Sequence, residues 1–500
     1  MSNATQAKNI ILCSDGTGNR GGKGHGTNVW RLFNYLDLDS QRHTPNAPRQ
    51  IGYYDDGVGT EDWKLFKIMG GAFGWGLSRN IRDLYQFLAS NYEPGDRIFL
   101  FGFSRGAFTV RSLAGMITRC GIVRREGTAS AAEFARLVHD AFQAYRDCHR
   151  RGDDSAARHF KREHSHGDEK IACIGVWDTV DAIGVPFDEL RVALDKIFKN
   201  SFHSHDLSPD IEYGYHALSI DDQRKTFHPV MWDEKLSAER GRKAGSIEQT
   251  WFAGVHANVG GGYPKQGLAN VTLEWMMRRA ERHGLIFEQG ALQTVTHAAN
   301  VGDKLYDSRA GLAAYYRYLP RDIEAITNKY CLGKARIHHS VFERIDQSPL
   351  GYGPGNLPEE FDIVSDGHPT PEGDAAGWDG LYARLREHRR RHQELLDQAR
   401  AYIAPRRRLY TVFILLSLLA LATTAYLKIG DPRYAELGWF SLAAWYRPLP
   451  MYLLEHPLLG AGVALVLAGI FLLRQHFIDQ TRERLREYWW RLRPLFRREP

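Results

Sequence analysis

The sequence lacks several patterns that identify common classes of protein. It has five cysteines, an odd number with no CxxC spacing (Cys13, Cys120, Cys148, Cys173 and Cys331). This argues against a disulfide framework and a zinc knuckle and favours a reducing compartment. No Gly-Lys-Ser/Thr follows the glycine-rich residues 21–26, which disfavours a phosphate-binding P-loop. No apolar run of signal-peptide length precedes Asp15, so we expect no secretory signal peptide.

An excess of one charge is also missing from most of the chain. The 500 residues carry a net charge of +6, with 43% hydrophobic and 25% charged residues, which is ordinary for a globular protein. Residues 384–500 contain 20 Lys and Arg against 10 Asp and Glu, whereas residues 1–383 contain 45 against 49. Since a nucleic-acid-binding protein carries its basic surface on the folded domain, we expect no nucleic-acid partner.

Residues 1–365 alternate between patterns of strand and helix. Short apolar runs at residues 9–13, 97–101, 171–176 and 250–255 predict buried parallel strands. Between them the clearest helical spacing is that of Leu77, Ile81, Leu84, Tyr85 and Leu88. This predicts an α/β fold, a mostly parallel sheet with helices on both faces. The length implies insertions, and residues 124–170 and 188–210 are candidate lid elements.

Long hydrophobic runs occur only near the C-terminus. A Gly/Pro/Asp-rich linker at residues 366–383 leads into an Arg-rich juxtamembrane helix at 384–408. Residues 409–427 carry no charge and, as a helix, span about 28 Å, close to the hydrocarbon core of a bilayer. A second uncharged run, 458–473, extends back to about residue 453. We predict a transmembrane hairpin over residues 409–473; the alternative is a pair of buried core helices.

Basic residues flank both predicted spans. Nine Arg lie in residues 384–408, eight in 474–498 and only three Lys or Arg in the connecting residues 428–457. The positive-inside rule therefore places the N-terminal domain and the C-terminus in the cytosol, at the inner (cytoplasmic) membrane. Residues 474–500 have the spacing of a basic amphipathic tail that lies on an anionic leaflet. The alternative is a helix packed on the main domain.

The strongest motif is a GxSxG sequence formed by Gly102, Ser104 and Gly106. It directly follows an apolar strand and precedes a helical run at residues 107–120. This context is typical of a nucleophile elbow, in which Ser104 stands on a sharp strand-to-helix turn and both glycines make room for neighbouring backbone. A structural turn is the less favoured alternative.

A nucleophilic serine needs an acid and a base, which follow it in the chain order acid, then histidine. Asp178 and His256 each come after a predicted strand and are the preferred pair. Asp181 and Asp221 are the fallback acids. The alternatives are an aspartate that caps a turn and a histidine with only a structural role.

The oxyanion of an acyl intermediate needs backbone N–H donors. One is the residue after the nucleophile, Arg105, and a second comes from an early strand-to-helix loop, here Gly16 or Thr17. A plain Asp-Gly turn is the alternative for that loop. We expect Asp15, Gly102, Gly106, Asn258 and Gly260 to line the site. The histidines at 159, 164 and 166 are interpreted as part of a solvated polar loop rather than as metal ligands.

Four blocks of sequence resemble those of a known family. They are DGTGN at 15–19, GFSRGA at 102–107, VWDTV at 176–180 and FAGVHANVGGGY at 252–263, with weaker matches at 218–232 and 338–358. Over residues 8–365 the chain resembles the bacterial α/β-hydrolases typified by the catalytic domain of type VI secretion phospholipase effectors. The resemblance implies Ser104 as nucleophile, Asp178 as acid, His256 as base and an ester substrate such as a phospholipid. That family usually has Gly where Asp181 stands.

The sequence thus predicts a membrane-anchored serine hydrolase of an α/β-hydrolase-like fold that cleaves lipid esters. The alternatives are a catalytically silent, membrane-tethered interaction module and an esterase of a soluble acyl ester. The mechanism needs no metal or organic cofactor. Membrane phospholipid is the expected substrate and anchor. Because a cytosolic lipase endangers its own membrane, we also expect lid gating or a regulatory or immunity partner.

Overall fold

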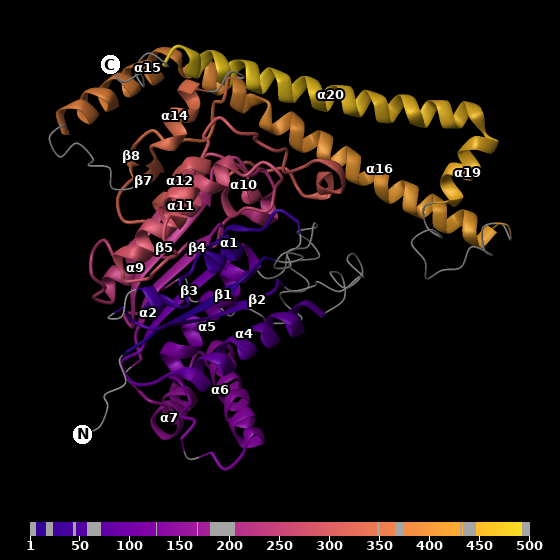
Figure 1. The fold of residues 1–500 in the computed structure, drawn as a ribbon. Coiled ribbons are helices and arrows are strands. Elements are labelled where there is room, and N and C mark those ends of the chain that lie inside the picture. The colour runs from indigo at the N-terminus through magenta and orange to yellow at the C-terminus, as the bar shows by residue number, and fades with distance from the viewer. Residues whose placement is uncertain are drawn as a thin grey trace, which may run out of the picture. The chain divides into compact units, whose positions relative to one another are not determined.

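The fold comes from a computed structural model (Figure 1). It describes residues 7–16, 24–43, 47–57, 72–126, 128–167, 169–180, 206–347, 351–365, 375–430, 433 and 447–492. The chain divides into two compact units. The sheet unit consists of residues 1–316, 320–350 and 356–380, and the helical unit of residues 317–319, 351–355 and 381–500.

The sheet unit is built on eight strands in the order β2-β1-β3-β4-β5-β6-β7-β8, and every neighbouring pair is parallel. The strands are β1 Asn9–Ser14, β2 Gln50–Asp55, β3 Arg97–Phe103, β4 Ile171–Trp177, β5 Ile211–Ser219, β6 Ile247–Phe252, β7 Ala335–His338 and β8 Phe361–Val364. All carboxyl ends therefore meet at one edge. β1 lies between β2 and β3, so successive strands are added on opposite sides of β1. In open parallel sheets, ligands bind in the crevice at such a reversal of strand order.

Alternating side chains of the strands enter two separate cores. Ile10 and Leu12 face a core shared with α4 Ala72–Asn91, α5 Arg105–Cys120, α6 Ala131–Arg151 and α7 Ser155–His164. Ile11 and Cys13 face a second core with α1 Asn28–Asn34, α11 Gly267–Arg282 and α12 Ala291–Ala298. The predicted α/β fold, with a parallel sheet and helices on both faces, is confirmed. The predicted apolar stripe of α4 is fully buried in the first core.

The described part of the sheet unit also contains shorter elements. The helices are α2 Ser40–His43, α9 Glu234–Glu239, α10 His256–Gly260, α13 Ile323–Tyr330 and α14 Ser340–Gln347, with 3-10 turns at Lys225–Phe227 and Gly311–Tyr315. One predicted strand is displaced, because β6 ends at Phe252 and the chain turns at Gly254, whose φ is +126°. His256 therefore begins a short helix rather than lying in a loop.

The described residues do not support the first lid candidate. Within residues 124–170, α6 and α7 bury Phe134, Phe142 and Phe160 in the first core, so this stretch is part of the layer that covers the sheet. Figure 1 draws these helices away from α10. The other candidate, 188–210, lies outside the described residues up to residue 205.

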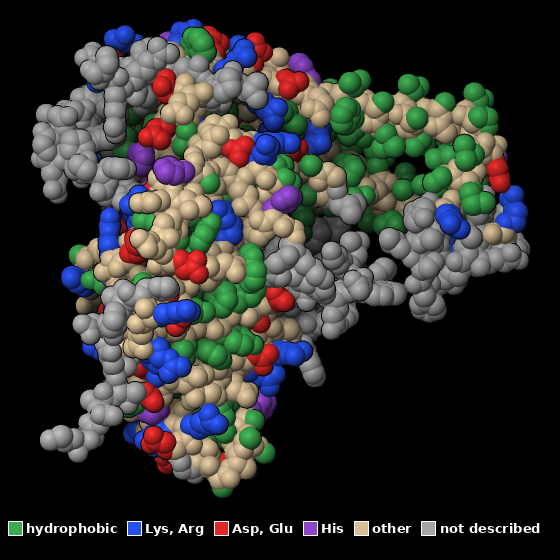
Figure 2. All heavy atoms as spheres, in the orientation of Figure 1, with side chains coloured by type: hydrophobic (Ala, Val, Ile, Leu, Met, Phe, Trp, Pro, Cys, Tyr) green, Lys and Arg blue, Asp and Glu red, His purple; other side chains and the backbone are tan. Residues whose placement is uncertain are grey.

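The described residues of the helical unit form four helices, α15 Ala375–Ala401, α16 Ile403–Gly430, α19 Pro448–Glu455 and α20 Pro457–Trp490. α15 begins at Ala375, so the described end of the expected linker is helical. Two stretches, Ala383–Gly430 and Pro457–Trp490, are long and apolar enough to cross a membrane. Leu458 is 90% exposed and Leu465 74% exposed, and Figure 2 shows hydrophobic side chains gathered along α16 and α20. A buried core helix would not expose leucines in this way.

The expected basic tail is the continuation of α20. Tyr488 and Trp489 are buried near its end. The indole N–H of Trp489 donates to the carbonyl oxygen of Pro354 at 2.9 Å, and His388 Nε2 of α15 lies 3.0 Å from the carbonyl oxygen of Tyr488. The end of this segment, up to residue 492, therefore packs on other parts of the helical unit.

Candidate active site

Ser104 stands between β3 and α5 in a conformation that few residues adopt. Its φ is 57° and its ψ is −119°, and its N–H donates to the carbonyl oxygen of Trp177 at 3.0 Å. A Cβ on Gly102 would lie 2.6 Å from the carbonyl oxygen of Gly106, and a Cβ on Gly106 would lie 2.5 Å from that of Asp15. The glycines are needed because backbone occupies both places, which is the geometry of a nucleophile elbow.

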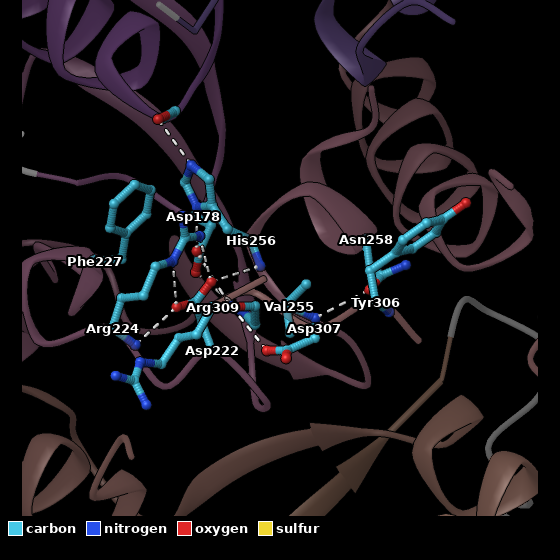
Figure 3. Close-up of polar contacts among 12 residues, drawn as sticks. Asp178, Asp222, Arg224, Phe227, Val255, His256, Asn258, Tyr306, Asp307 and Arg309 are labelled. Carbon is cyan, nitrogen blue, oxygen red and sulfur yellow. Dashed lines mark hydrogen bonds and ion pairs between the residues drawn. The ribbon is translucent and has the colours of Figure 1, made fainter. Parts of the chain in front are cut away.

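Two distant side chains, Asp178 and His256, meet Ser104 at this elbow. Figure 3 shows Asp178 and His256. Asp178 directly follows β4, and His256 begins α10 after β6. His256 Nε2 lies 2.8 Å from Ser104 Oγ, and its Nδ1 lies 2.6 Å from Asp178 Oδ2. All three are buried, with 7%, 0% and 6% of Ser104, Asp178 and His256 exposed. The sequence-predicted trio thus forms one hydrogen-bonded chain, as in a nucleophile, base and orienting acid.

The Asp178 carboxylate has further partners that the sequence did not reveal. Arg321, which precedes α13, donates from its two terminal nitrogens to the two carboxylate oxygens at 2.6 and 2.8 Å. The backbone N–H of Ser219 donates to Oδ1 at 3.0 Å, and its hydroxyl to Oδ2 at 3.2 Å. Asp178 is therefore held by a charged fork and by the end of β5 as well as by His256.

These contacts set the protonation of the pair. Burial alone would raise the pKa of Asp178, but the charge of Arg321 and the hydrogen bonds from His256 and Arg321 outweigh it and hold this pKa well below its usual range. Burial lowers the pKa of His256, and the nearby Asp178 offsets this only in part. The geometry therefore favours an ionised aspartate beside a neutral imidazole, the state in which a histidine accepts a proton from serine.

A second ion pair supports His256 from the other side. The backbone N–H of His256 donates to Asp222 Oδ2 at 3.2 Å, and Arg224 forms a two-pronged pair with the Asp222 carboxylate at 3.0 and 2.6 Å. The guanidinium of Arg224 lies 3.4 Å from the ring centroid of Phe227, whose edge packs against the His256 ring. Sequence reasoning assigned these residues no role, and their only signal was that all three lie within the weaker 218–232 match.

The candidate oxyanion donors Arg105 and Gly16 have different surroundings. Arg105 is the first residue of α5, and the first N–H groups of a helix point out of its N-terminal end. Burial lowers the pKa of the Arg105 side chain to about 9. The N–H of Gly16 donates to Asp15 Oδ1 at 2.6 Å, so in this structure it is engaged within its own turn. Thr17 lies outside the described residues.

Asp15 itself organises the turn after β1. Its Oδ2 accepts hydrogen bonds from the hydroxyls of Thr27 and Tyr54, each at 2.6 Å, and the residue is 3% exposed. Because the backbone of Asp15 abuts Gly106, this network fixes the strand end against the elbow. Its role in the structure is to shape the wall of the site.

The last two predicted lining residues support His256. Asn258 accepts from the N–H of Val255 at 3.4 Å and donates to the carbonyl oxygen of Lys304 at 3.1 Å, which ties α10 to a neighbouring loop. A Cβ on Gly260 would overlap the ring of Phe103, and that ring packs on His256 with centroids 4.6 Å apart.

Of the two fallback acids, only Asp221 lies within the described residues. Asp221 Oδ2 accepts the N–H of Gly254 at 2.7 Å, and Asp181 lies outside the described residues. His159 and His164 are on α7. In the part of the chain that the structure describes, no three His, Cys, Asp or Glu side chains gather as metal ligands.

Two proteins that are similar to parts of this chain are themselves uncharacterized. An uncharacterized protein of the yeast Saccharomyces cerevisiae, YEL023C, is 31% identical over 241 residues, 45% of this chain and 33% of that protein. The match thus spans about a third of that relative's length, and it extends the similarity beyond bacteria. A crystal structure of an uncharacterized protein from Pseudomonas aeruginosa aligns at 17% identity, with a TM-score of 0.33, over 58% of this chain and 48% of that one.

A family model matches a larger share of the chain. It covers residues 8–279, more than half of the sequence, and is described as "T6SS, Phospholipase effector Tle1-like, catalytic domain". The match contains β1 through β6 and therefore Ser104, Asp178 and His256. The chain belongs to the family of Tle1-like phospholipase effector catalytic domains.

Proposed function

We propose that this protein is a membrane-anchored serine hydrolase that cleaves carboxylic ester bonds of phospholipids. The observation that carries the proposal is the hydrogen-bonded chain from Ser104 through His256 to Asp178 on a nucleophile elbow. Membership of a phospholipase effector family supports a lipid ester as substrate. The two apolar helices support a place at a membrane.

In the proposed reaction, Ser104 Oγ attacks the acyl carbonyl carbon while His256 Nε2 takes its proton. Asp178 keeps the imidazole in the tautomer with hydrogen on Nδ1 and stabilises the imidazolium that forms. The backbone N–H of Arg105 and a donor from residues 16 and 17 would stabilise the oxyanion, and losing one such donor costs on the order of 10²–10³ in rate. The protonated His256 then protonates the leaving alcohol, and water repeats the sequence on the acyl-enzyme.

The test compares wild type with Ser104→Ala in detergent-solubilised full-length protein. We expect wild type to hydrolyse phospholipid and to be labelled by a fluorophosphonate probe, and Ser104→Ala to lose both. Ser130→Ala is the control, because Ser130 is an exposed N-cap of α6 and its loss costs only about 1 kcal/mol of stability. If the probe does not label wild type, the proposed enzymatic activity is refuted and the catalytically silent interaction module is favoured.

Substrate class is tested by the physical form of the ester. Anchoring restricts enzyme and bilayer lipid to one surface and so raises their effective concentration. We therefore expect a phospholipid in vesicles to be cleaved with a higher kcat/KM than a water-soluble acyl ester of the same chain length. A preference for the soluble ester would assign only a locating role to the helices.

We further propose that the sheet unit and the C-terminus face the cytosol. The support is the excess of Arg on both outer flanks of the spans. All five native cysteines are buried, so single cysteines introduced as Ala435→Cys and Glu499→Cys can be probed with an impermeant maleimide on intact cells. We expect labelling at position 435 alone; labelling at 499 alone would reverse the orientation.

A further inference from the structure

We propose that Arg321 is a positioning residue of the triad, which orients the Asp178 carboxylate and sets the acid limit of the pH range in which the triad works. This inference rests on the proposed function. It gives a role in the reaction to a residue that lies outside the matched residues 8–279.

The contacts of Arg321 leave its guanidinium one position. The side chain is fully buried, and its two terminal nitrogens bind both oxygens of Asp178. The same nitrogens donate to the carbonyl oxygens of Ser219 at 2.6 Å and Phe227 at 2.5 Å. The backbone of Arg321 is also held, because the side-chain amide of Asn356 donates to the carbonyl oxygen of Arg321 at 3.0 Å. A planar fork fixed in this way fixes the plane of the carboxylate that it binds.

That orientation decides which oxygen faces the histidine. Arg321 and the Ser219 N–H occupy Oδ1, while Oδ2 also receives His256 Nδ1 at 2.6 Å. Without the fork, the carboxylate could rotate about its bond to Cβ and turn away from the imidazole. The expected consequence is a lower kcat with little change in KM, since Arg321 lies behind Asp178 and does not contact Ser104.

Charge gives Arg321 its second role. The charged groups that face His256 are Asp178 at the ring, Asp222 at the backbone N–H and Arg224, which pairs with Asp222. His216 also lies near Asp178 and Arg321, but burial lowers its pKa to about 3, so its ring is neutral in this pH range. With Arg321 behind Asp178, the two carboxylates and two guanidiniums of this set balance. Removing the charge of Arg321 leaves this set, which includes the Asp178–His256 pair itself, with one net negative charge. A proton then binds this pair more tightly, whichever of the two residues carries it. The acid limb of the pH profile must move to higher pH.

The experiment measures kcat and KM of full-length Arg321→Gln and Arg321→Lys between pH 4 and 9. Glutamine keeps hydrogen-bond donors without the charge, and lysine keeps the charge without the fork. We expect Arg321→Gln to lose at least about tenfold in kcat, with KM within threefold, and to move its acid limb up by at least about 0.5 pH unit. Arg321→Lys should lose kcat but keep the acid limb of wild type.

Arg279→Met is the matched control. Arg279 is 3% exposed and pairs with Glu248 at 2.5 Å near the start of β6, at the opposite edge of the sheet. The Arg279→Met variant should show the general effect of breaking a buried ion pair. The acid limb of its pH profile should stay at the pH of wild type. An acid limb in Arg321→Gln within 0.2 unit of wild type overturns the proposal, as does failure of both Arg321 variants to fold while Arg279→Met folds. Retained activity in Ser104→Ala would instead refute the proposed function.

Discussion

Gly102→Ala tests the elbow most directly, because the obstruction is entirely backbone. An added Cβ would lie 2.6 Å from the carbonyl oxygen of Gly106 and 2.7 Å from the backbone N and Cα of Ala107. Carbon and oxygen normally approach to roughly 3.3–3.6 Å, so the first turn of α5 must retreat by at least about 0.7 Å. The strand cannot yield easily, since Gly102 pairs with Ser14 on one side and Val176 on the other.

The retreat moves Ser104 away from His256. A misplacement of about 1 Å can cost on the order of 10² in rate, and overpacking costs about 1–3 kcal/mol of stability. We therefore expect kcat/KM for a phospholipid to fall by roughly 30- to 100-fold, with a lower melting temperature. The assay is initial-rate hydrolysis on protein shown to be folded by thermal melting.

Gly115→Ala in the same helix is the control for this change. There the added Cβ meets only the side chain of Tyr145, whose hydroxyl lies 2.9 Å away. The small displacement of that ring is offset by about 1 kcal/mol of helix propensity. We expect kcat/KM within threefold of wild type. Wild-type kcat/KM and melting temperature in Gly102→Ala would contradict the elbow geometry itself.

Three further predictions concern the base, the acid and the anchor. Because burial lowers the pKa of His256 and the proposed base is the neutral ring, the acid limb of kcat/KM should be a one-proton limb centred below pH 6.5. A limb centred above pH 6.5 would contradict this. Asp178→Asn should lower kcat by about 10⁴ through the wrong tautomer, and a loss below tenfold in steady-state assays would argue against its role. Leu465→Arg should weaken membrane insertion by about 2.5–3.5 kcal/mol and reduce recovery in vesicle flotation, whereas Leu38→Arg, at an exposed site of the sheet unit, should float like wild type.

The sequence predicts best those strands and helices whose apolar pattern is not interrupted by polar residues. β1, β3 and β4 are short apolar runs buried on both faces, and α4 has an unbroken apolar stripe. The elbow was predictable because its two glycines and its serine stand between such a strand and a helix. In these segments local pattern and tertiary environment agree.

β6 shows why other strands were displaced or missed. Its first half contains Glu248 and Gln249, which look unsuited to a buried strand. In the fold, Glu248 pairs with Arg279, and Gln249 exchanges hydrogen bonds with the backbone of Trp232 at both ends of its amide. These partners lie more than fifteen residues away, so local hydrophobicity could not reveal that the polar groups are satisfied.

The same reason hid Arg321 and Asp222 from sequence analysis. Asp178 and His256 were found because each follows a strand and precedes distinctive residues. Arg321 lies 143 residues from Asp178 along the chain and follows no strand, and nothing local distinguishes it from the other arginines. Its role follows only from the fold, which places its guanidinium against a buried carboxylate.

The backbone offers an argument for the site that does not depend on any side-chain contact. Among the residues that the structure describes, Ser104 and Asp178 are the two non-glycine residues with positive φ, 57° and 40°. Such conformations cost about 1–3 kcal/mol each and persist only where the surroundings impose them. Here the sheet imposes them, since the N–H of Ser104 donates to Trp177 and that of Asp178 to Ala217, at 3.0 and 2.8 Å, which continues the ladders of β3 with β4 and of β4 with β5. Aspartate adopts positive φ more readily than serine does, so the conformation is most unusual at Ser104. The strain falls on two residues that His256 joins, as the proposed function expects of a nucleophile and its acid.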